Sequence, residues 1–196
     1  GPAVASLRMA ASNDAALLVS GTIDRARGET LRQDAQGSGG AVSYILESRE
    51  VRGVPFRGTA PGGDPATWDL ALNREVPISL KVSTGVGKAT LDLTGLQLTG
   101  LDVNSGVGQT IVTMPAQGRF AAKIDAGVGE VIVQVPTGMA ARIHVTSGLG
   151  SVVMPTGYAR DGDWYVSPGY ATATNRIDLD ISGGVGRIAV EEIGGR

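Results

Sequence analysis

Three side chains of this sequence could do acid–base chemistry if the fold brought them together: Asp102, Asp125 and His144. Two carboxyl groups about 5–10 Å apart can hydrolyse a glycosidic bond, and a histidine beside an acid can act as a general base. His144 is the chain's only histidine. All three fall at outward positions of expected strands, where opposite charges on neighbouring strands stabilise a sheet by about 0.2–1 kcal/mol per pair. We therefore predict charge pairs at Asp102 and Asp125, and a solvated surface residue at His144, which is expected to lie between Lys123 and Asp180 of neighbouring repeats. No catalytic residue and no metal site are predicted.

A second candidate is the segment of about residues 156–175, which is rich in aromatic and acidic residues. Asp161-Gly162-Asp163 could begin a calcium loop, but the remaining ligand spacing is missing. A β-hairpin or an Ω-loop with an Asp-Gly turn is the preferred interpretation. Because aromatic side chains anchor interfaces, the segment is a candidate interaction surface through Tyr158, Trp164 and Tyr165. No cofactor is predicted.

The composition excludes several classes of function. The net charge of −2 gives no basic excess for nucleic-acid phosphates, and the absence of cysteine excludes disulfides and thiolate metal sites. No apolar stretch reaches the roughly 18 residues that cross a membrane. The opening Gly1-Pro2 is typical of a protease-cleavage scar, so we expect any signal or membrane anchor to lie outside this sequence.

A Gly-apolar-Gly triplet that recurs every 21 residues predicts the fold. The fifth triplet comes 36 residues after the fourth, one period plus the insertion at about 156–175; the triplets are Gly85-Val86-Gly87, Gly106-Val107-Gly108, Gly127-Val128-Gly129, Gly148-Leu149-Gly150 and Gly184-Val185-Gly186. The glycines should allow a sharp reversal and close backbone approach, with the central Val or Leu pointing into the core. A dinucleotide site is not expected, because the third glycine and a following helix are missing.

Strict apolar alternation on both sides of each triplet predicts two strands per repeat. Among the strands that precede the triplets, only Thr99 departs from this alternation. A 21-residue unit cannot bury its own apolar face, so neighbouring units must stack. The sequence therefore predicts an all-β fold, a β-solenoid of ~21-residue two-strand coils stacked in chain order as two sheets. A meander of antiparallel hairpins is the alternative.

Two regions are expected within one continuous domain. Residues 1–75 should form degenerate coils and loops that cap the stack, and residues 76–196 the regular repeat. Polar, glycine-rich composition predicts loops at 24–40 and 53–66.

The second strands carry an unexpected apolar stripe. Their outward positions hold Ile111, Ile132 and Val153 in three consecutive repeats, and such a stripe normally has a cover. The insertion, the loops of residues 24–66, and a protein partner or second copy of the chain are the alternatives.

The chain resembles the toast-rack family in its repeated unit, for example Ser105-Gly106-Val107-Gly108 followed by Val112 and Pro115. The resemblance extends to two motifs before the repeats, Trp68-Asp69-Leu70-Ala71-Leu72-Asn73 and Val76-Pro77-Ile78. That family includes the extracytoplasmic domains of LiaF-like cell-wall-stress proteins and related adhesin-type proteins. The resemblance implies a stacked β fold and a place in the bacterial cell envelope. It implies no catalytic residue, because the shared motif is structural.

These observations predict a non-enzymatic structural or interaction module of the bacterial envelope, outside the cytoplasmic membrane, in adhesion or envelope-stress signalling. Two alternatives stay open. One is a carbohydrate-active enzyme or polysaccharide-binding β-helix, with Asp102, Asp125 and His144 along a cleft; the other is a self-assembling scaffold. The expected partner is a protein or a second copy bound through the apolar stripe. Nucleic acid is not expected, and a membrane only through a segment outside this sequence.

Overall fold

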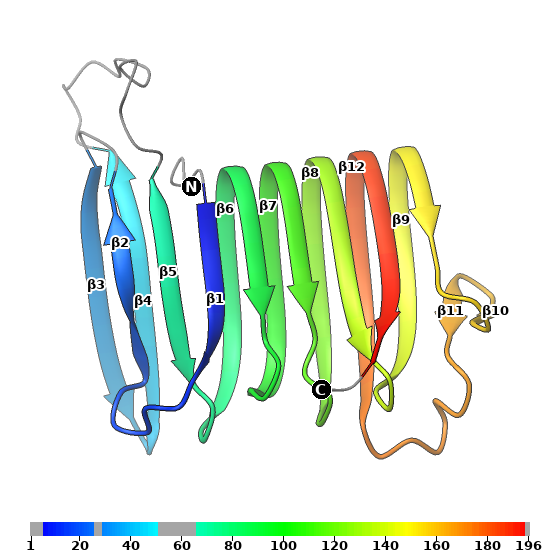
Figure 1. Cartoon of the computed structure of the whole chain (residues 1–196), viewed down its shortest axis with the longest axis horizontal. Coiled ribbons are helices and arrows are strands. Elements are labelled where there is room, and N and C mark those ends of the chain that lie inside the picture. Colours follow the sequence, from blue (N-terminus) through cyan, green and yellow to red (C-terminus); the bar gives the residue numbers. More distant parts are fainter. Residues whose placement is uncertain (1–5, 26–28, 51–65, 195–196) are drawn as a thin grey trace.

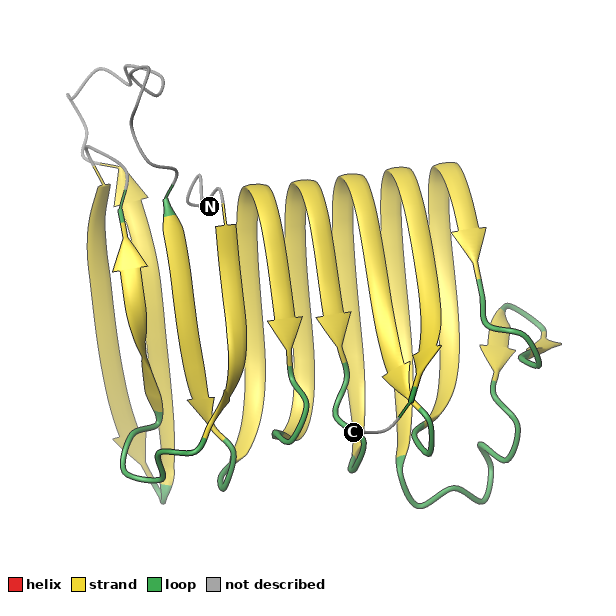
Figure 2. Ribbon diagram, in the orientation of Figure 1, coloured by secondary structure: helices red, strands yellow, loops and turns green. Residues whose placement is uncertain are grey.

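The computed structural model describes residues 6–25, 29–50 and 66–194, in which the regular elements are β-strands (Figure 2). The prediction of an all-β fold is therefore confirmed. In chain order the strands are β1 (Ser6–Ser12), β2 (Val19–Asp24), β3 (Glu29–Ser38), β4 (Ala41–Glu50), β5 (Thr67–Asn73), β6 (Pro77–Asp92), β7 (Gln97–Thr113), β8 (Arg119–Pro136), β9 (Ala140–Val153), β10 (Ala159–Asp161), β11 (Trp164–Val166) and β12 (Arg176–Ile193). No helix that could cross a membrane occurs among these residues.

The long strands β6, β7, β8, β12 and β9 each wrap around the body, and each turns from one side to the other at its glycine triplet (Figure 1). We call one such strand a coil. Neighbouring coils pair in parallel along both of their halves. This pairing is the one that a β-solenoid requires, and it excludes the antiparallel meander for this part of the chain.

The order of the coils differs from the predicted chain order, because β12 lies between β8 and β9. Asp180 therefore lies between Lys123 and His144, and the prediction that placed His144 between Lys123 and Asp180 is wrong. The observed order also brings Arg187 next to Glu130, with 2.8 Å between Nη1 and Oε1. Opposite charges are thus adjacent where chain order would have separated them.

Inward residues of both halves of the coils fill one continuous apolar core, as the alternation predicted. The irregularity at Thr99 has a local cause. The pairing of β6 with β7 shifts by one residue, so that Leu98 faces Ile78 and Gly100 faces Ser79. Thr99 is the extra residue of this β-bulge, and Leu98, 5% exposed, takes the buried position instead.

Of the two predictions made for the triplets, one is confirmed and one is wrong. In four triplets a Cβ atom on the second glycine would collide with the carbonyl group of the neighbouring coil, as Gly108 would with Gly87, so glycine is required there for close stacking. The central residues do not point into the core. They are 48–73% exposed at the bend: Val86, Val107, Val128, Val185 and Leu149. The core lies on the concave side of each bend, and these side chains point away from it.

The N-terminal part extends the stack beyond β6 (Figure 1). β1 pairs in parallel with β6 and β5, and β2 pairs antiparallel with β5. β3 and β4 form a separate antiparallel pair, so the predicted loop at 24–40 is wrong over Glu29–Ser38, where Leu31 packs against the core. Most of the predicted loop at 53–66 lies outside the described residues. The division at residues 75 and 76 stays a prediction.

Candidate functional site

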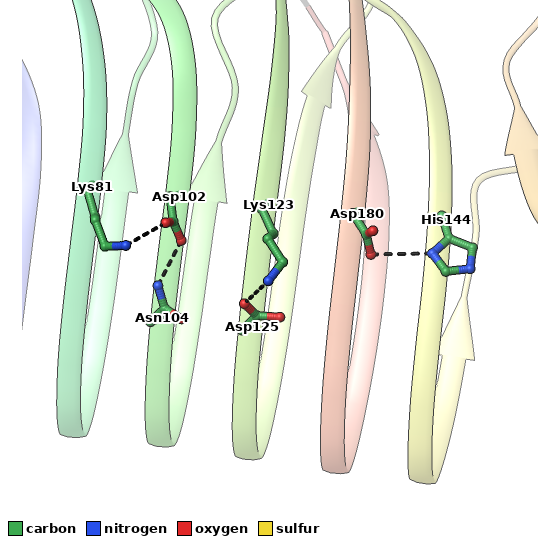
Figure 3. Close-up of polar contacts among 7 residues, drawn as sticks. All are labelled: Lys81, Asp102, Asn104, Lys123, Asp125, His144 and Asp180. Carbon is green, nitrogen blue, oxygen red and sulfur yellow. Dashed lines mark hydrogen bonds and ion pairs between the residues drawn. The ribbon is translucent and has the colours of Figure 1, made fainter.

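The first halves of the coils carry a row of alternating basic and acidic residues on their outer face (Figure 3). The row runs Lys81, Asp102, Lys123, Asp180 and His144, one residue from each coil. Such a row results when residues of the same repeat position stack in register, because every outward side chain then meets its equivalents on both neighbouring coils.

Asp102 is held by two donors on this face. Lys81 Nζ lies 2.8 Å from Asp102 Oδ2, and Asn104 Nδ2 donates to Oδ1 at 2.7 Å. The hydrogen bond from the Lys81 ammonium is the main reason why the pKa of Asp102 lies below its ordinary value. A carboxyl group held in its ionised form suits ion pairing rather than proton donation.

The other two candidate acid–base residues have separate partners (Figure 3). Asp125 accepts a hydrogen bond from Lys123 at 2.7 Å, which raises the pKa of Lys123 above its ordinary value. His144 Nδ1 lies 3.3 Å from Asp180 Oδ1. Asp102, Asp125 and His144 thus belong to three different pairs. The pairs of the two aspartates agree with the prediction, whereas His144, expected as a solvated surface residue, has Asp180 as a partner. Within the described residues no three acidic or histidine side chains are grouped so that they could hold a metal ion.

Of the two forms predicted for the insertion, hairpin and Ω-loop, the structure shows the hairpin. β10 and β11 pair antiparallel across a turn of Gly162 and Asp163, where Gly162 has a φ of 59°. β11 then pairs antiparallel with the first half of β9, where Trp164 lies beside His144. The hairpin therefore closes the outer edge of that sheet and places the Trp164 indole on the charged outer face.

Trp164 belongs to an ordered cluster on this face. The Arg142 guanidinium lies 4.6 Å from the Trp164 ring centroid and 5.6 Å from that of Tyr170, within the range of cation–π contacts. Arg142 Nε and Tyr170 Oη both donate to Asp178 Oδ1, at 2.8 and 2.6 Å. Burial, and then the hydrogen bond to Asp178, raise the pKa of Tyr170. The His144 ring lies 5.3 Å from that of Trp164, so the indole is positioned on two sides.

Beside this cluster lies a shallow groove of about 280 Å³. It lies over β7, β8 and β12 and is bordered by the indole of β11; its lining residues are Leu101, Ala121, Ala122, Lys123, Trp164, Asp178, Leu179 and Asp180. Ala121 pairs in register with Gly100. These two small outward residues leave room where other coils carry Ser79, Asp178 or Arg142. The hollow is therefore a consequence of the sequence.

The predicted aromatic residues of the insertion have different environments. The hydroxyl of Tyr158 is buried, and burial raises the pKa of Tyr158 to about 12, with the nearby charge of Glu192 as a second cause. Tyr165 packs partly against the core and accepts a hydrogen bond from Arg160 Nη1 at 2.7 Å. Of the three, Trp164 is the one that borders the groove. Their role as an interaction surface stays a prediction.

The predicted apolar stripe is interrupted. Because β12 lies between β8 and β9, Ala189 separates Ile132 from Val153. Ala189 is fully buried, whereas Val153 is 43% exposed. The hairpin pairs with Arg142–His144, on the other half of β9, so it does not pair along the half that carries Val153. Whether Ile111, Ile132 and Val153 contact a partner stays a prediction.

The sequence did not predict that Ala121, Lys123, Asp178 and Asp180 line one groove. A signal was present, because Gly100 and Ala121 are small residues at the same outward position of consecutive repeats. Their combination with Trp164 could not be seen without the true order of the coils.

These features define a class of protein in which long β-strands wrap around the body, stack in parallel and carry charge pairs on their outer face. Residues 4–134 match the family described as "N-terminal domain of toast_rack, DUF2154". The chain belongs to this toast-rack family, which confirms the resemblance seen in its repeats.

The chain is also similar to a crystal structure of a "putative cell adhesion protein" from Clostridium sporogenes ATCC 15579. The TM-score is 0.75 and the sequence identity 23%, over 96% of this chain and 88% of that chain. At this identity the likeness shows the fold alone. A comparison with curated proteins found no match.

Proposed function

We propose that this chain is a non-enzymatic interaction module of the bacterial cell envelope, located outside the cytoplasmic membrane. It would present a rigid β-solenoid face to an envelope component, in adhesion or in envelope-stress signalling. Membership of the toast-rack family supports this proposal. So does the structural likeness to the "putative cell adhesion protein" from Clostridium sporogenes.

The observation that carries the proposal is the arrangement of the outer face. The residues best suited to acid–base chemistry are engaged in polar pairs: Lys81–Asp102 and Lys123–Asp125, which are charge pairs, and His144–Asp180. The one break in the repeat adds a hairpin whose indole borders a groove on that same face. A face with ordered polar pairs and a positioned aromatic residue suits binding.

The alternative of a carbohydrate-active enzyme has less support. Asp102, Asp125 and His144 are not among the residues that line the groove, and paired catalytic carboxyl groups must flank the bound sugar. The alternative of a self-assembling scaffold is a separate expectation, which light scattering of the purified chain would test.

Cosedimentation with washed envelopes of the bacterium that encodes the chain tests the proposal. We expect saturable binding to the envelopes and none to the cytosolic fraction. Equal retention by both fractions, or by neither, would contradict an envelope module. Release of reducing sugar ends that disappears in both Asp102→Asn and Asp125→Asn would instead show that the chain is a glycosidase.

A further inference from the structure

We propose that the groove beside Trp164 binds a neutral carbohydrate, such as one or two sugar units of an envelope polysaccharide. The inference rests on the proposed function, because that function implies that the chain meets its ligand in the bacterial envelope. The binding chemistry itself follows from the residues around the groove, on the outer faces of β8 and β12 and at the tip of β11.

The size of the groove favours a small ligand unit. Its volume of about 280 Å³ is just below the roughly 300–1,000 Å³ typical of small-molecule sites. The floor is the exposed Ala121 with the backbone around Leu101 and Ala122, and nothing larger occupies that position in β7, where Gly100 is its equivalent. A single sugar ring can lie on such a floor, whereas a protein interface would need a larger and flatter area.

The charges around the groove favour a ligand without net charge. Asp178 is paired with Arg142 at 2.8 Å, Asp180 with His144 at 3.3 Å, and Lys123 with Asp125 at 2.7 Å. Asp178 and Lys123 thus each have a partner of opposite charge outside the groove, and Asp180 has a hydrogen-bonding partner there in His144. An anionic or cationic ligand would have to compete with these partners.

The same groups still have hydrogen-bonding capacity for hydroxyl groups. The contacts of Asp178 and Asp180 are made through Oδ1, and a carboxylate has a second oxygen that can accept hydrogen bonds. An ammonium group such as that of Lys123 has three donors, of which the contact with Asp125 needs one. Sugar hydroxyls donate and accept, so they match a wall that contains both acceptors and donors.

The indole supplies the remaining element. Trp164 adds an aromatic, apolar surface at the edge of a polar groove, and its orientation is fixed by Arg142 at 4.6 Å and His144 at 5.3 Å. A sugar ring has apolar C–H faces and polar edges, so it can contact the indole and the charged wall at once. A preordered aromatic ring binds with little loss of conformational entropy.

In the experiment, the purified chain is titrated with matched tetrasaccharides, and binding is measured by calorimetry and by tryptophan fluorescence. The neutral probes are chitotetraose and cellotetraose, and the charged probes are the glucosamine tetramer and tetragalacturonate. We expect a neutral probe to bind with a Kd of about 0.1–5 mM and to change the emission of Trp164. Trp68 is buried in the core and should not respond.

Two variants locate the binding site. Ala121→Leu fills the groove from an exposed outward position, and Trp164→Ala removes the indole; each should weaken binding at least about tenfold. The matched controls are Ser79→Leu, the same new side chain in the same row on β6, and Tyr44→Ala in β4, and both should bind like the original chain. Thermal unfolding of each variant verifies that it is folded.

Three results would overturn the inference: no binding of either neutral tetramer, tighter binding of a charged tetramer, or binding that Ala121→Leu and Trp164→Ala leave unchanged. Envelope cosedimentation separates this inference from the proposed function. If Ala121→Leu still cosediments like the original chain, the groove is not the contact, although an envelope module remains supported. If the original chain binds sugar but no envelope, the proposed function fails instead.

Discussion

Replacing Gly108 by alanine would place a Cβ atom 2.8 Å from the carbonyl carbon of Gly87 on the neighbouring coil, and closer still to its oxygen. Carbon atoms in contact are normally about 3.5–4.0 Å apart. The backbone cannot move away, because Gly108 is also paired with Gly129 on the opposite side. Overpacking of this kind costs about 1–3 kcal/mol.

The backbone conformation adds a second cost at the same position. Gly108 has a φ of 139°, and an L-residue held in a sparsely populated conformation costs on the order of 1–3 kcal/mol. The two effects together predict that Gly108→Ala loses about 2–6 kcal/mol. That is a large fraction of the roughly 5–15 kcal/mol by which domains are stable.

Two further glycines of β7 separate these effects. A Cβ on Gly106 would lie 3.2 Å from the carbonyl carbon of Gly85 without an unusual φ, so Gly106→Ala should lose only the packing part. A Cβ on Gly100 would meet Ser79 Oγ at an ordinary 3.5 Å. Gly100→Ala should therefore be neutral, or stabilising by up to about 1 kcal/mol, because alanine restricts the unfolded chain.

Urea unfolding followed by circular dichroism measures all three variants against the original chain. The expected order of destabilisation is Gly108→Ala, then Gly106→Ala, then Gly100→Ala. The reasoning would be refuted if Gly108→Ala stayed within about 0.5 kcal/mol of the original chain, or if Gly100→Ala were as destabilising as Gly108→Ala.

Three other predictions concern titration and packing. The pKa of Asp102 is lowered by Lys81. The stability that ionised Asp102 contributes is therefore present above the unfolded pKa of about 3.9 and is lost as the pH falls through the folded pKa. Asp102→Asn should flatten the acid side of a plot of Tm against pH. The pKa of Tyr158 is raised to about 12, so stability should fall as the pH rises from about 10 to 12, and Tyr158→Phe should reduce that fall. Val128 is 49% exposed and Val133 fully buried, so Val133→Ala should lower the midpoint of urea unfolding clearly more than Val128→Ala.

The repeat period predicts the strands, the inward residues and the need for glycine, because each of these depends on a residue and its nearest stacked neighbour. It does not predict the order of the coils. Every coil has the same register, so Gly127 could stack against either Gly148 or Gly184. Outward charges such as Glu130 and Arg187 distinguish the two orders, but each pair contributes only about 0.2–1 kcal/mol. The sequence therefore contained a signal for the observed order of the coils, but the energy difference behind it is small.

The direction of the triplet side chains was mispredicted for a different reason. Alternation of inward and outward residues holds while a strand runs straight, and it predicts Val107 to be inward like Val103 before it. At the bend the phase changes, and Thr110 is the next buried residue after the triplet. A simple period of two therefore fails wherever a coil passes from one sheet to the other.

The groove and the order of the coils have one origin. The insertion leaves the stack after β9, pairs β11 along the edge of β9, and returns so that β12 lies between β8 and β9. This return brings Asp178 and Asp180 beside Ala121 and Lys123, while the hairpin supplies Trp164. With the coils in chain order, Asp178 and Asp180 would follow β9 and no longer adjoin Ala121. A change in the insertion should therefore alter the binding face and the stacking together, which links the insertion in the repeat to the proposed function of the chain.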